Sequence, residues 1–184
     1  MHALKQFFAK MKGGEKAQPP VLHWRNALCS WLGGFLGIAL VGWLGSTNSL
    51  SEQDNLFLIG SFGATAVLIY GAPSTPLAQP RNVLGGHLVS ALVGVTVYQL
   101  LPDPLWLASA LAVSTAILAM YLTGTTHPPG GATALIAIIG SEEVHALGYT
   151  YVFDPVSKGV VLMLIVALLM NNLSPYRSYP KTWF

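Results

Sequence analysis

Two short strings of the chain combine glycine with hydroxyl side chains in a way that suits binding of a small anion. The first string covers residues 61–65 and the second covers residues 126–133. If a helix begins at each string, its first backbone N–H groups lack intrahelical partners and its dipole places partial positive charge there. Hydroxyl groups add uncharged donors, and glycine lets a ligand approach the backbone. The predicted substrate-binding residues are Ser61, Gly63, Thr65, Thr126, His127, Gly130, Gly131 and Thr133. For any single hydroxyl, a helix cap or a bond to a helix carbonyl is the alternative.

Three titratable side chains lie in or near these strings. His127 precedes two prolines at the second predicted helix start, where an imidazolium would attract an anion or carry a proton with it. We expect it to act as a gate that opens toward acid pH if its pKa stays near the ordinary value of about 6.5; a bond to a loop carbonyl is the alternative. His87 lies within a predicted membrane span, and Arg81 precedes that span as either a cytoplasmic gate or an interfacial anchor.

Several chemistries have no matching pattern in the chain. No Asp or Glu lies inside the apolar runs, which disfavours proton pumps and cation carriers. The phosphate loop, the Gly-x-Ser-x-Gly elbow and the His-Glu-x-x-His helix are missing, and the only cysteine is Cys29. We therefore expect a protein that is not an enzyme and uses no metal or cofactor. The few terminal cations suit lipid headgroups rather than nucleic acid.

Composition indicates a membrane protein. Of the 184 residues, 53% are apolar and 9% are charged, whereas soluble domains carry roughly 25% charged residues. Four runs are long enough to approach or cross a bilayer as helices: 26–45, 83–101, 105–122 and 159–173. Two more runs, 56–71 and 130–140, are short and rich in glycine, and we interpret them as half-helices or broken helices. The expected fold is an all-α polytopic bundle of four long spans and two short or broken helices.

The distribution of Lys and Arg predicts the orientation of this bundle. Five cations precede the first apolar run, and only Lys158 lies in the loops that a six-segment arrangement places outside. Both termini are then cytoplasmic. A four-span arrangement also keeps both termini inside but moves Arg81 outside. The predicted domains are a basic N-terminal segment at 1–25, a transmembrane domain at 26–173 and a cytoplasmic tail at 174–184. The basic N-terminus lacks an Arg/Ser-rich transit pattern, which favours a bacterial inner membrane.

The two short runs share the string Gly-Ala-Thr-Ala, at 63–66 and 131–134. The offset is 68 positions (131 − 63), and the same shift moves the 83–101 run largely onto the last apolar run. Each repeat then has three crossings, so the second is inverted relative to the first. Inverted repeats with paired, interrupted helices indicate a transporter site near the bilayer midplane. Close packing at small residues, as at Gly33 and Gly37, is the alternative explanation.

Longer strings carry a family resemblance. Residues 127–135, His-Pro-Pro-Gly-Gly-Ala-Thr-Ala-Leu, resemble the signature of the HPP family of small integral membrane proteins. Residues 61–68 and 72–82 are similar to its second signature, and Gly85-Gly86-His87 extends the match. The resemblance implies several membrane spans. It also implies nitrite as the leading substrate, because plastid and cyanobacterial members have been assigned to nitrite transport.

Residues and resemblance together predict a transporter or channel for a small inorganic anion. Nitrite would bind between the two strings, and valine at both Gly63 and Gly131 should then block permeation. Two alternatives stay open: a carrier for formate, nitrate or a halide, and a membrane scaffold or subunit that moves no solute. The sequence does not distinguish a channel from a carrier, and self-association into a homo-oligomer is plausible for so small a bundle.

Overall fold

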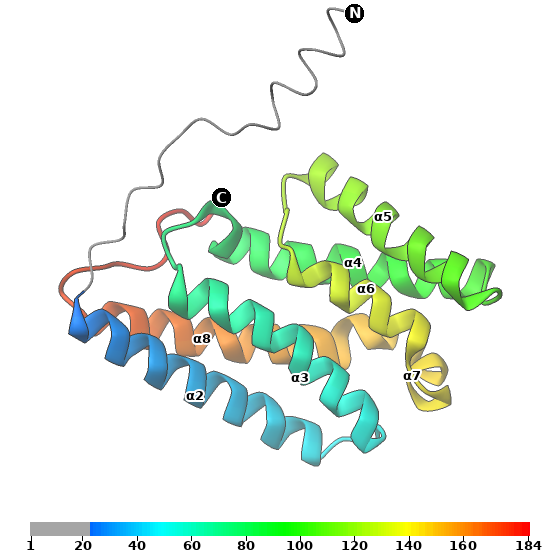
Figure 1. The fold of residues 1–184 in the computed structure, drawn as a ribbon, viewed down its shortest axis with the longest axis horizontal. Coiled ribbons are helices and arrows are strands. Elements are labelled where there is room, and N and C mark those ends of the chain that lie inside the picture. Colours follow the sequence, from blue (N-terminus) through cyan, green and yellow to red (C-terminus); the bar gives the residue numbers. More distant parts are fainter. Residues whose placement is uncertain (1–22) are drawn as a thin grey trace, which may run out of the picture.

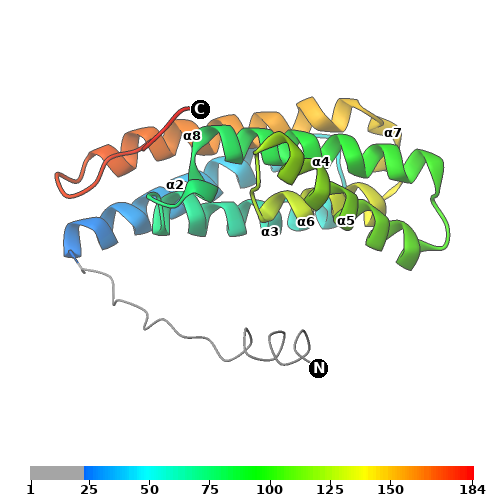
Figure 2. The same ribbon diagram turned by 90° about the horizontal axis from the view of Figure 1, so that it is seen from above.

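The computed structural model describes residues 23–184, and all regular elements within this part are helical. The predicted N-terminal segment at 1–25 therefore lies almost wholly outside the described residues. The long helices run roughly parallel or antiparallel to one another in a flat bundle (Figures 1 and 2). Their bounds are α2 (Trp24–Ser46), α3 (Glu52–Ala66), α4 (Pro80–Leu100), α5 (Leu105–Thr123), α6 (Pro129–Ile139), α7 (Glu142–Leu147) and α8 (Lys158–Asn172). Shorter helical turns are η1 (Val67–Gly71), η2 (Pro76–Ala78) and η3 (Val152–Ser157).

Local sequence explains where these helices begin and end. Ser51 caps α3 by accepting a hydrogen bond from the backbone of Asp54. Proline occupies the first turn of α4 and α6, where no backbone donor is needed. Gly124 ends α5 with a φ of 64°, a conformation that glycine adopts without strain.

The all-α polytopic fold is confirmed, with one change in the number of long spans. Among the described residues five helices are long and apolar enough to cross a membrane, and Glu52–Gly71 is one of them with 20 residues. The prediction that this segment is short was wrong because α3 starts earlier, at Glu52, and continues into the wider turn η1. Within residues 23–184, Pro129–Ile139, with 11 residues, is the one short apolar helix, as predicted.

Two helix pairs fit an inverted repeat, whereas the extensive packing of α4 on α6 has no counterpart in the weak contact between α8 and α3. The first repeat contains α2, α3 and α4, and the second contains α5, α6 and α8. Helix α2 packs on α8, the last helix of the other repeat, and α5 packs on α4 in the same way. The middle helices α3 and α6 run antiparallel, since Asp54 near the start of α3 bonds Ser141 just after the end of α6.

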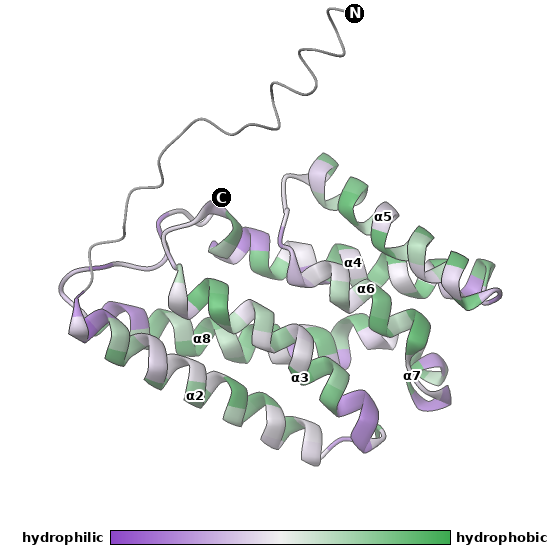
Figure 3. Cartoon of the chain, viewed as in Figure 1, coloured by the Kyte–Doolittle hydropathy of each residue, from purple (hydrophilic) through white to green (hydrophobic). Residues whose placement is uncertain are grey.

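Aromatic side chains mark the faces that meet lipid. On α2, Trp24 and Trp43 lie near opposite ends and are mostly exposed. Trp106 and Tyr121 stand in the same way at the two ends of α5. Such pairs of aromatic side chains are typical of the two membrane interfaces. Hydrophobic residues cover most of the helix length between these ends (Figure 3).

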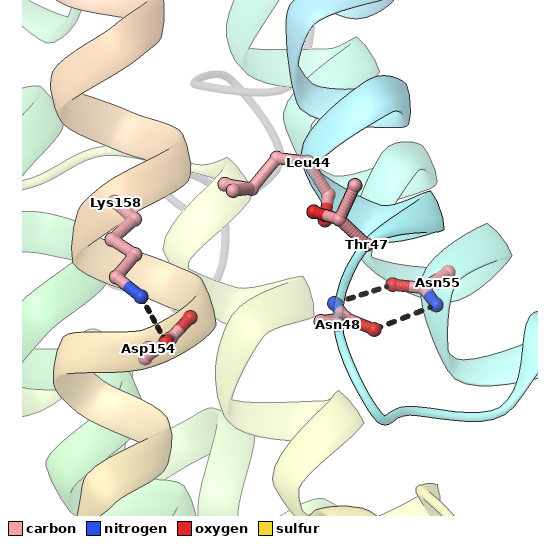
Figure 4. Close-up of polar contacts among 6 residues, drawn as sticks. All are labelled: Leu44, Thr47, Asn48, Asn55, Asp154 and Lys158. Carbon is pink, nitrogen blue, oxygen red and sulfur yellow. Dashed lines mark hydrogen bonds and ion pairs between the residues drawn. The ribbon is translucent and has the colours of Figure 1, made fainter.

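The end of the bundle where α2 turns into α3 carries two polar contacts, one half-buried and one exposed (Figure 4). Asn48 and Asn55 exchange side-chain hydrogen bonds of 3.0 and 3.1 Å, which fix the turn between the two helices. Lys158 pairs with Asp154 at the start of α8, and this is the only salt bridge among residues 23–184. Neither contact involves His87 or His127, which are buried inside the bundle.

Inside the bundle the space at Gly33 and Gly37 holds an aromatic ring. A Cβ atom at Gly33 would lie 2.7 Å from Cδ1 of Tyr70, and one at Gly37 would lie 2.2 Å from its hydroxyl oxygen. Tyr70 is fully buried and donates to the carbonyl of Met163 at 3.0 Å. These glycines therefore make room for a side chain of η1 that joins α2 to α8.

Candidate functional site

His87 is the centre of a buried polar cluster between α3, α4 and α6. Its side chain is 0% exposed although it lies in the middle of an apolar bundle. The ring nitrogen Nε2 lies 2.8 Å from the hydroxyl oxygen of Thr65, and Nδ1 lies 2.7 Å from the hydroxyl oxygen of Thr133. Both hydrogen-bonding positions of the imidazole are therefore used by side chains from two other helices.

His127 extends the cluster toward the loop that precedes α6. Its Nε2 lies 3.1 Å from the Thr65 hydroxyl, so this one hydroxyl joins two imidazoles. Its Nδ1 lies 2.7 Å from the carbonyl oxygen of Leu77. The rings of His87 and His127 are 5.0 Å apart, and His127 is also 0% exposed.

Ser61 closes the other side of the cluster. Its hydroxyl lies 3.1 Å from the Thr133 hydroxyl and 3.1 Å from the carbonyl oxygen of Pro129. Tyr151, in the segment before α8, also contacts the cluster and donates to the backbone carbonyl of Thr133 at 3.1 Å. The cluster thus links both repeats through side chains that are all buried.

Equivalent residues of the two repeats hold the central imidazole. Thr65 and Thr133 stand 68 positions apart (133 − 65), which is the offset of the shared string. Each threonine also lies near the carbonyl one helical turn earlier: Ser61 at 3.3 Å for Thr65, and Pro129 at 3.5 Å for Thr133. Ser61 and Pro129 are themselves related by the same offset.

Close backbone contact between α4 and the α5–α6 connection makes this arrangement possible. A Cβ atom at Gly86 would lie 2.5 Å from Cβ of His127 and 2.9 Å from the carbonyl oxygen of Thr125. One at Gly130 would lie 2.8 Å from the carbonyl oxygen of Gly86. Only glycine at these two positions lets the helices approach closely enough for His87 to reach Thr133.

The first predicted helix start is wrong. Ser61 and Gly63 lie well inside α3, which begins at Glu52, so their backbone N–H groups are not at a helix N-terminus. The sequence-based prediction placed the start too late because it relied on the glycine and hydroxyl residues at 61–65 and not on the Ser51 cap. The second start is correct, because α6 begins at Pro129. However, the N–H groups of Gly130 and Gly131 donate to the carbonyls of His127 and Pro128.

Four predicted residues lie outside the cluster. A Cβ atom at Gly63 would meet no atom within 4 Å, and one at Gly131 would meet only Val113 at 3.9 Å, so valine there would not fill the cluster. Thr126 contributes a backbone carbonyl that accepts from the Asn82 side chain. Arg81 is exposed and donates to the Thr123 carbonyl at 2.9 Å, a contact that suits an anchor.

The hydrogen-bond partners define where the protons lie when both histidines are neutral. The Leu77 carbonyl only accepts, so His127 carries its proton on Nδ1 and accepts at Nε2 from Thr65. The single proton of Thr65 is then used, and His87 must donate to Thr65 from Nε2. His87 consequently accepts at Nδ1 from Thr133. The two histidines are thus opposite tautomers, protonated at Nδ1 in His127 and at Nε2 in His87, within one continuous series of hydrogen bonds.

The cluster contains no permanent charge. Among residues 23–184, no carboxylate, lysine or arginine makes a hydrogen bond or salt bridge to His87, His127 or their threonines. Within the same part of the chain, no group of three or more His, Cys, Asp or Glu side chains is arranged to hold a metal ion. A charge on either imidazole would therefore lie in an apolar region without a counterion, which is costly.

Two partners of the cluster had no signal in the sequence. The Leu77 carbonyl sets the tautomer of His127 from the loop between α3 and α4, and Tyr151 approaches from the segment before α8. Neither follows from a motif, because each contact depends on how distant helices pack. His87 and Thr133 were separate predictions, and the structure brings them together.

A helical bundle with at least five membrane-long helices and an uncharged buried cluster defines a multi-pass membrane protein. The family model described as HPP, transmembrane region, matches residues 19–180, and the chain belongs to this family. A transmembrane protein of Dictyostelium discoideum is 45% identical over 182 residues, covering 97% of this chain and 58% of the relative. A second one is 41% identical over 183 residues, covering 97% of this chain and 64% of the relative. The chain therefore spans about three fifths of the length of these relatives. No solved structure matches the chain.

Proposed function

We propose that the protein transports a small inorganic anion across the membrane and that nitrite is the first substrate to test. The observation that carries this proposal is the buried cluster around His87, which contains hydroxyls and imidazoles but no carboxylate. Uncharged donors bind an anion without holding it too tightly to release. The family resemblance adds nitrite as the leading anion.

The position of the cluster supports a transport role. His87 lies seven residues after α4 begins at Pro80, which is about 10 Å along the helix. If α4 begins at the membrane surface, this depth falls within the hydrocarbon region. A buried ionisable side chain at such a depth is a functional candidate by default. The cluster also joins the two inverted repeats, where many transporters bind their substrates.

In the structure described here the hydroxyls of Thr65 and Thr133 are bonded within the cluster. Anion binding therefore requires these hydroxyls to turn away from the imidazoles. The helix N-terminus at Gly130 and Gly131 contributes less than the sequence predicted, because its N–H groups already have partners.

Uptake of nitrite into liposomes tests this function. Purified protein is reconstituted beside protein-free liposomes, and Thr133→Val is compared with Thr133→Ser and with Thr115→Val on the exposed face of α5. We expect uptake above the protein-free control, an approximately tenfold loss in Thr133→Val from one missing hydrogen bond, and near-normal uptake in the other two variants. Competition with formate, nitrate and chloride distinguishes nitrite from other anions.

Absence of uptake in folded, inserted protein would contradict the proposal and favour a membrane scaffold or subunit that moves no solute. The proposal includes cytoplasmic termini, with the tail at 174–184 inside, and a possible homo-oligomer. A bacterial inner membrane is a further prediction, although the two relatives come from Dictyostelium discoideum. We also propose that the protein is not an enzyme, needs no cofactor and binds no nucleic acid.

A further inference from the structure

We propose that His87 and His127, joined by Thr65, form a proton-binding pair that takes up a proton together with the transported anion. This inference rests on the proposed anion transport and adds the co-substrate. It follows from the hydrogen bonds of the cluster, which can accept an added proton without movement of any side-chain heavy atom.

One proton added at His127 rearranges the hydrogen bonds of Thr65. In the neutral state Thr65 donates to Nε2 of His127 at 3.1 Å. When Nε2 gains a proton it becomes a donor, and the Thr65 hydroxyl must point elsewhere. The carbonyl oxygen of Ser61 lies 3.3 Å away and accepts this hydroxyl proton. Thr65 then accepts from both imidazoles, and every polar atom keeps a partner.

His87 can take up a proton in an equivalent way, through Thr133 of the second repeat. A proton added at Nδ1 of His87 displaces the Thr133 hydroxyl, whose proton turns toward the Pro129 carbonyl at 3.5 Å. Ser61 continues to donate to Thr133 or to Pro129, both at 3.1 Å. Each imidazole therefore faces a threonine with a second acceptor one helical turn away.

The groups around the two imidazoles provide no fixed negative charge for an added proton. The ionisable side chain that approaches from the segment before α8 is Tyr151, which donates to the Thr133 carbonyl. None of the acidic side chains of the elements that pack here contacts the imidazoles: Glu52 on α3 is exposed, Asp54 on α3 bonds Ser141, and Asp154 on η3 pairs with Lys158. Among the described residues no fixed anion balances an imidazolium. A bound anion would balance it, so each ligand strengthens the binding of the other by the same factor.

The proposal predicts electroneutral uptake. Liposomes with a trapped pH indicator are given nitrite at an external pH above 7, with and without a membrane potential set by potassium and valinomycin. Protein-free liposomes measure the permeation of nitrous acid. We expect lumen acidification in step with nitrite uptake and a rate that the potential does not change. Uptake that follows the potential without a change of lumen pH would overturn the coupling while the proposed function stands.

The matched variants replace imidazole by an amide that forms hydrogen bonds but does not take up a proton. His87→Gln and His127→Gln are compared with His145→Gln, whose side chain stacks on Tyr98 outside the cluster. We expect proton uptake to disappear in the first two variants and to persist in the third. Normal proton coupling in both cluster variants would contradict the proposal.

A second measurement does not depend on transport. Nitrogen-15 spectra of the histidines should show His127 protonated at Nδ1 and His87 protonated at Nε2, with added nitrite converting one ring to imidazolium. Rings that stay neutral with saturating nitrite would overturn the pair as a proton-binding site. If nitrite is not transported but an imidazolium forms, the proposed function fails and the proton-binding pair stands.

Discussion

Thr65 and Thr133 occupy equivalent positions of an inverted repeat and bond opposite nitrogens of the same imidazole. Their hydroxyl oxygens lie 2.8 Å from Nε2 and 2.7 Å from Nδ1 of His87. The repeat therefore has a direct structural meaning, because each half supplies one side of the same polar cluster. The asymmetry lies in the histidines, since both side-chain partners of Thr65 are imidazoles, whereas the side-chain partners of Thr133 are one imidazole and Ser61.

This difference predicts unequal effects of removing the two hydroxyls. Thr65→Val leaves a nitrogen of both His87 and His127 unpaired, whereas Thr133→Val leaves only one unpaired because Ser61 keeps the Pro129 carbonyl. Each buried unpaired group costs about 1–3 kcal/mol. Unfolding by denaturant in mild detergent should rank Thr65→Val as less stable than Thr133→Val.

Thr115→Val, on an exposed face of α5, serves as the control and should leave the free energy of unfolding nearly unchanged. Serine at position 65 should recover much of the lost stability because it keeps the hydroxyl. Equal stabilities for the two valine variants would show that the Thr65 bridge to His127 contributes little.

Much of the fold follows from the sequence because membrane helices are defined by length and hydropathy. The start of α3 was harder to predict, since Ser51 and Glu52 lie in a polar stretch that looks like a loop. The string 61–65 contributes to the cluster, although not as the helix start that the sequence predicted. Its Ser61 and Thr65 belong to the site as side chains inside a helix and not as a helix start.

The contacts of His87 were not predictable from local pattern. Its partners lie 22 and 46 positions away, and only the packing of α4 against α3 and α6 brings them to the ring. The repeat offset offered a clue, because it paired Thr65 with Thr133, but it did not say which residue lies between them. The position of His87 between the two threonines depends on Gly86, which lets α4 approach His127.

Gly86→Ala should therefore be strongly destabilising. The added Cβ atom would lie 2.5 Å from Cβ of His127 and 2.9 Å from the Thr125 carbonyl oxygen, so the backbone must shift. Overpacking of this kind costs about 1–3 kcal/mol. Gly34→Ala is the matched control, because no atom lies within 4 Å of its added Cβ. Thermal unfolding in detergent should show a lower midpoint for the first variant alone, and equal midpoints would argue against the close approach.

Asp54 should stabilise the contact between the two repeats at the opposite end of α3. Its side chain is 1% exposed and accepts from the backbone N–H of Ser141 at 3.0 Å and from its hydroxyl at 2.5 Å. Asp54→Ala removes hydrogen bonds to a charged group, which are worth about 1.5–3 kcal/mol each. We expect faster hydrogen exchange in the first turn of α3 and around Ser141, compared with the exposed loop variant Asp103→Ala. Unchanged exchange would mean that this contact does not hold the helix ends together.

The topology predicts which loops share a side of the membrane. Single cysteines replace the exposed residues Ser49, Asp103 and Ser178 in a background where Cys29 is replaced by alanine. Because α3 separates Ser49 from the loop before α4, and α4 separates that loop from Asp103, positions 49 and 103 should face the same side. Ser178 follows α8 and should face the other side, which the excess of Lys and Arg assigns to the cytoplasm. A thiol reagent that does not cross membranes should label positions 49 and 103 in intact cells and position 178 only after the cells are opened. Labelling of position 178 together with position 49 in intact cells would require a different number of crossings.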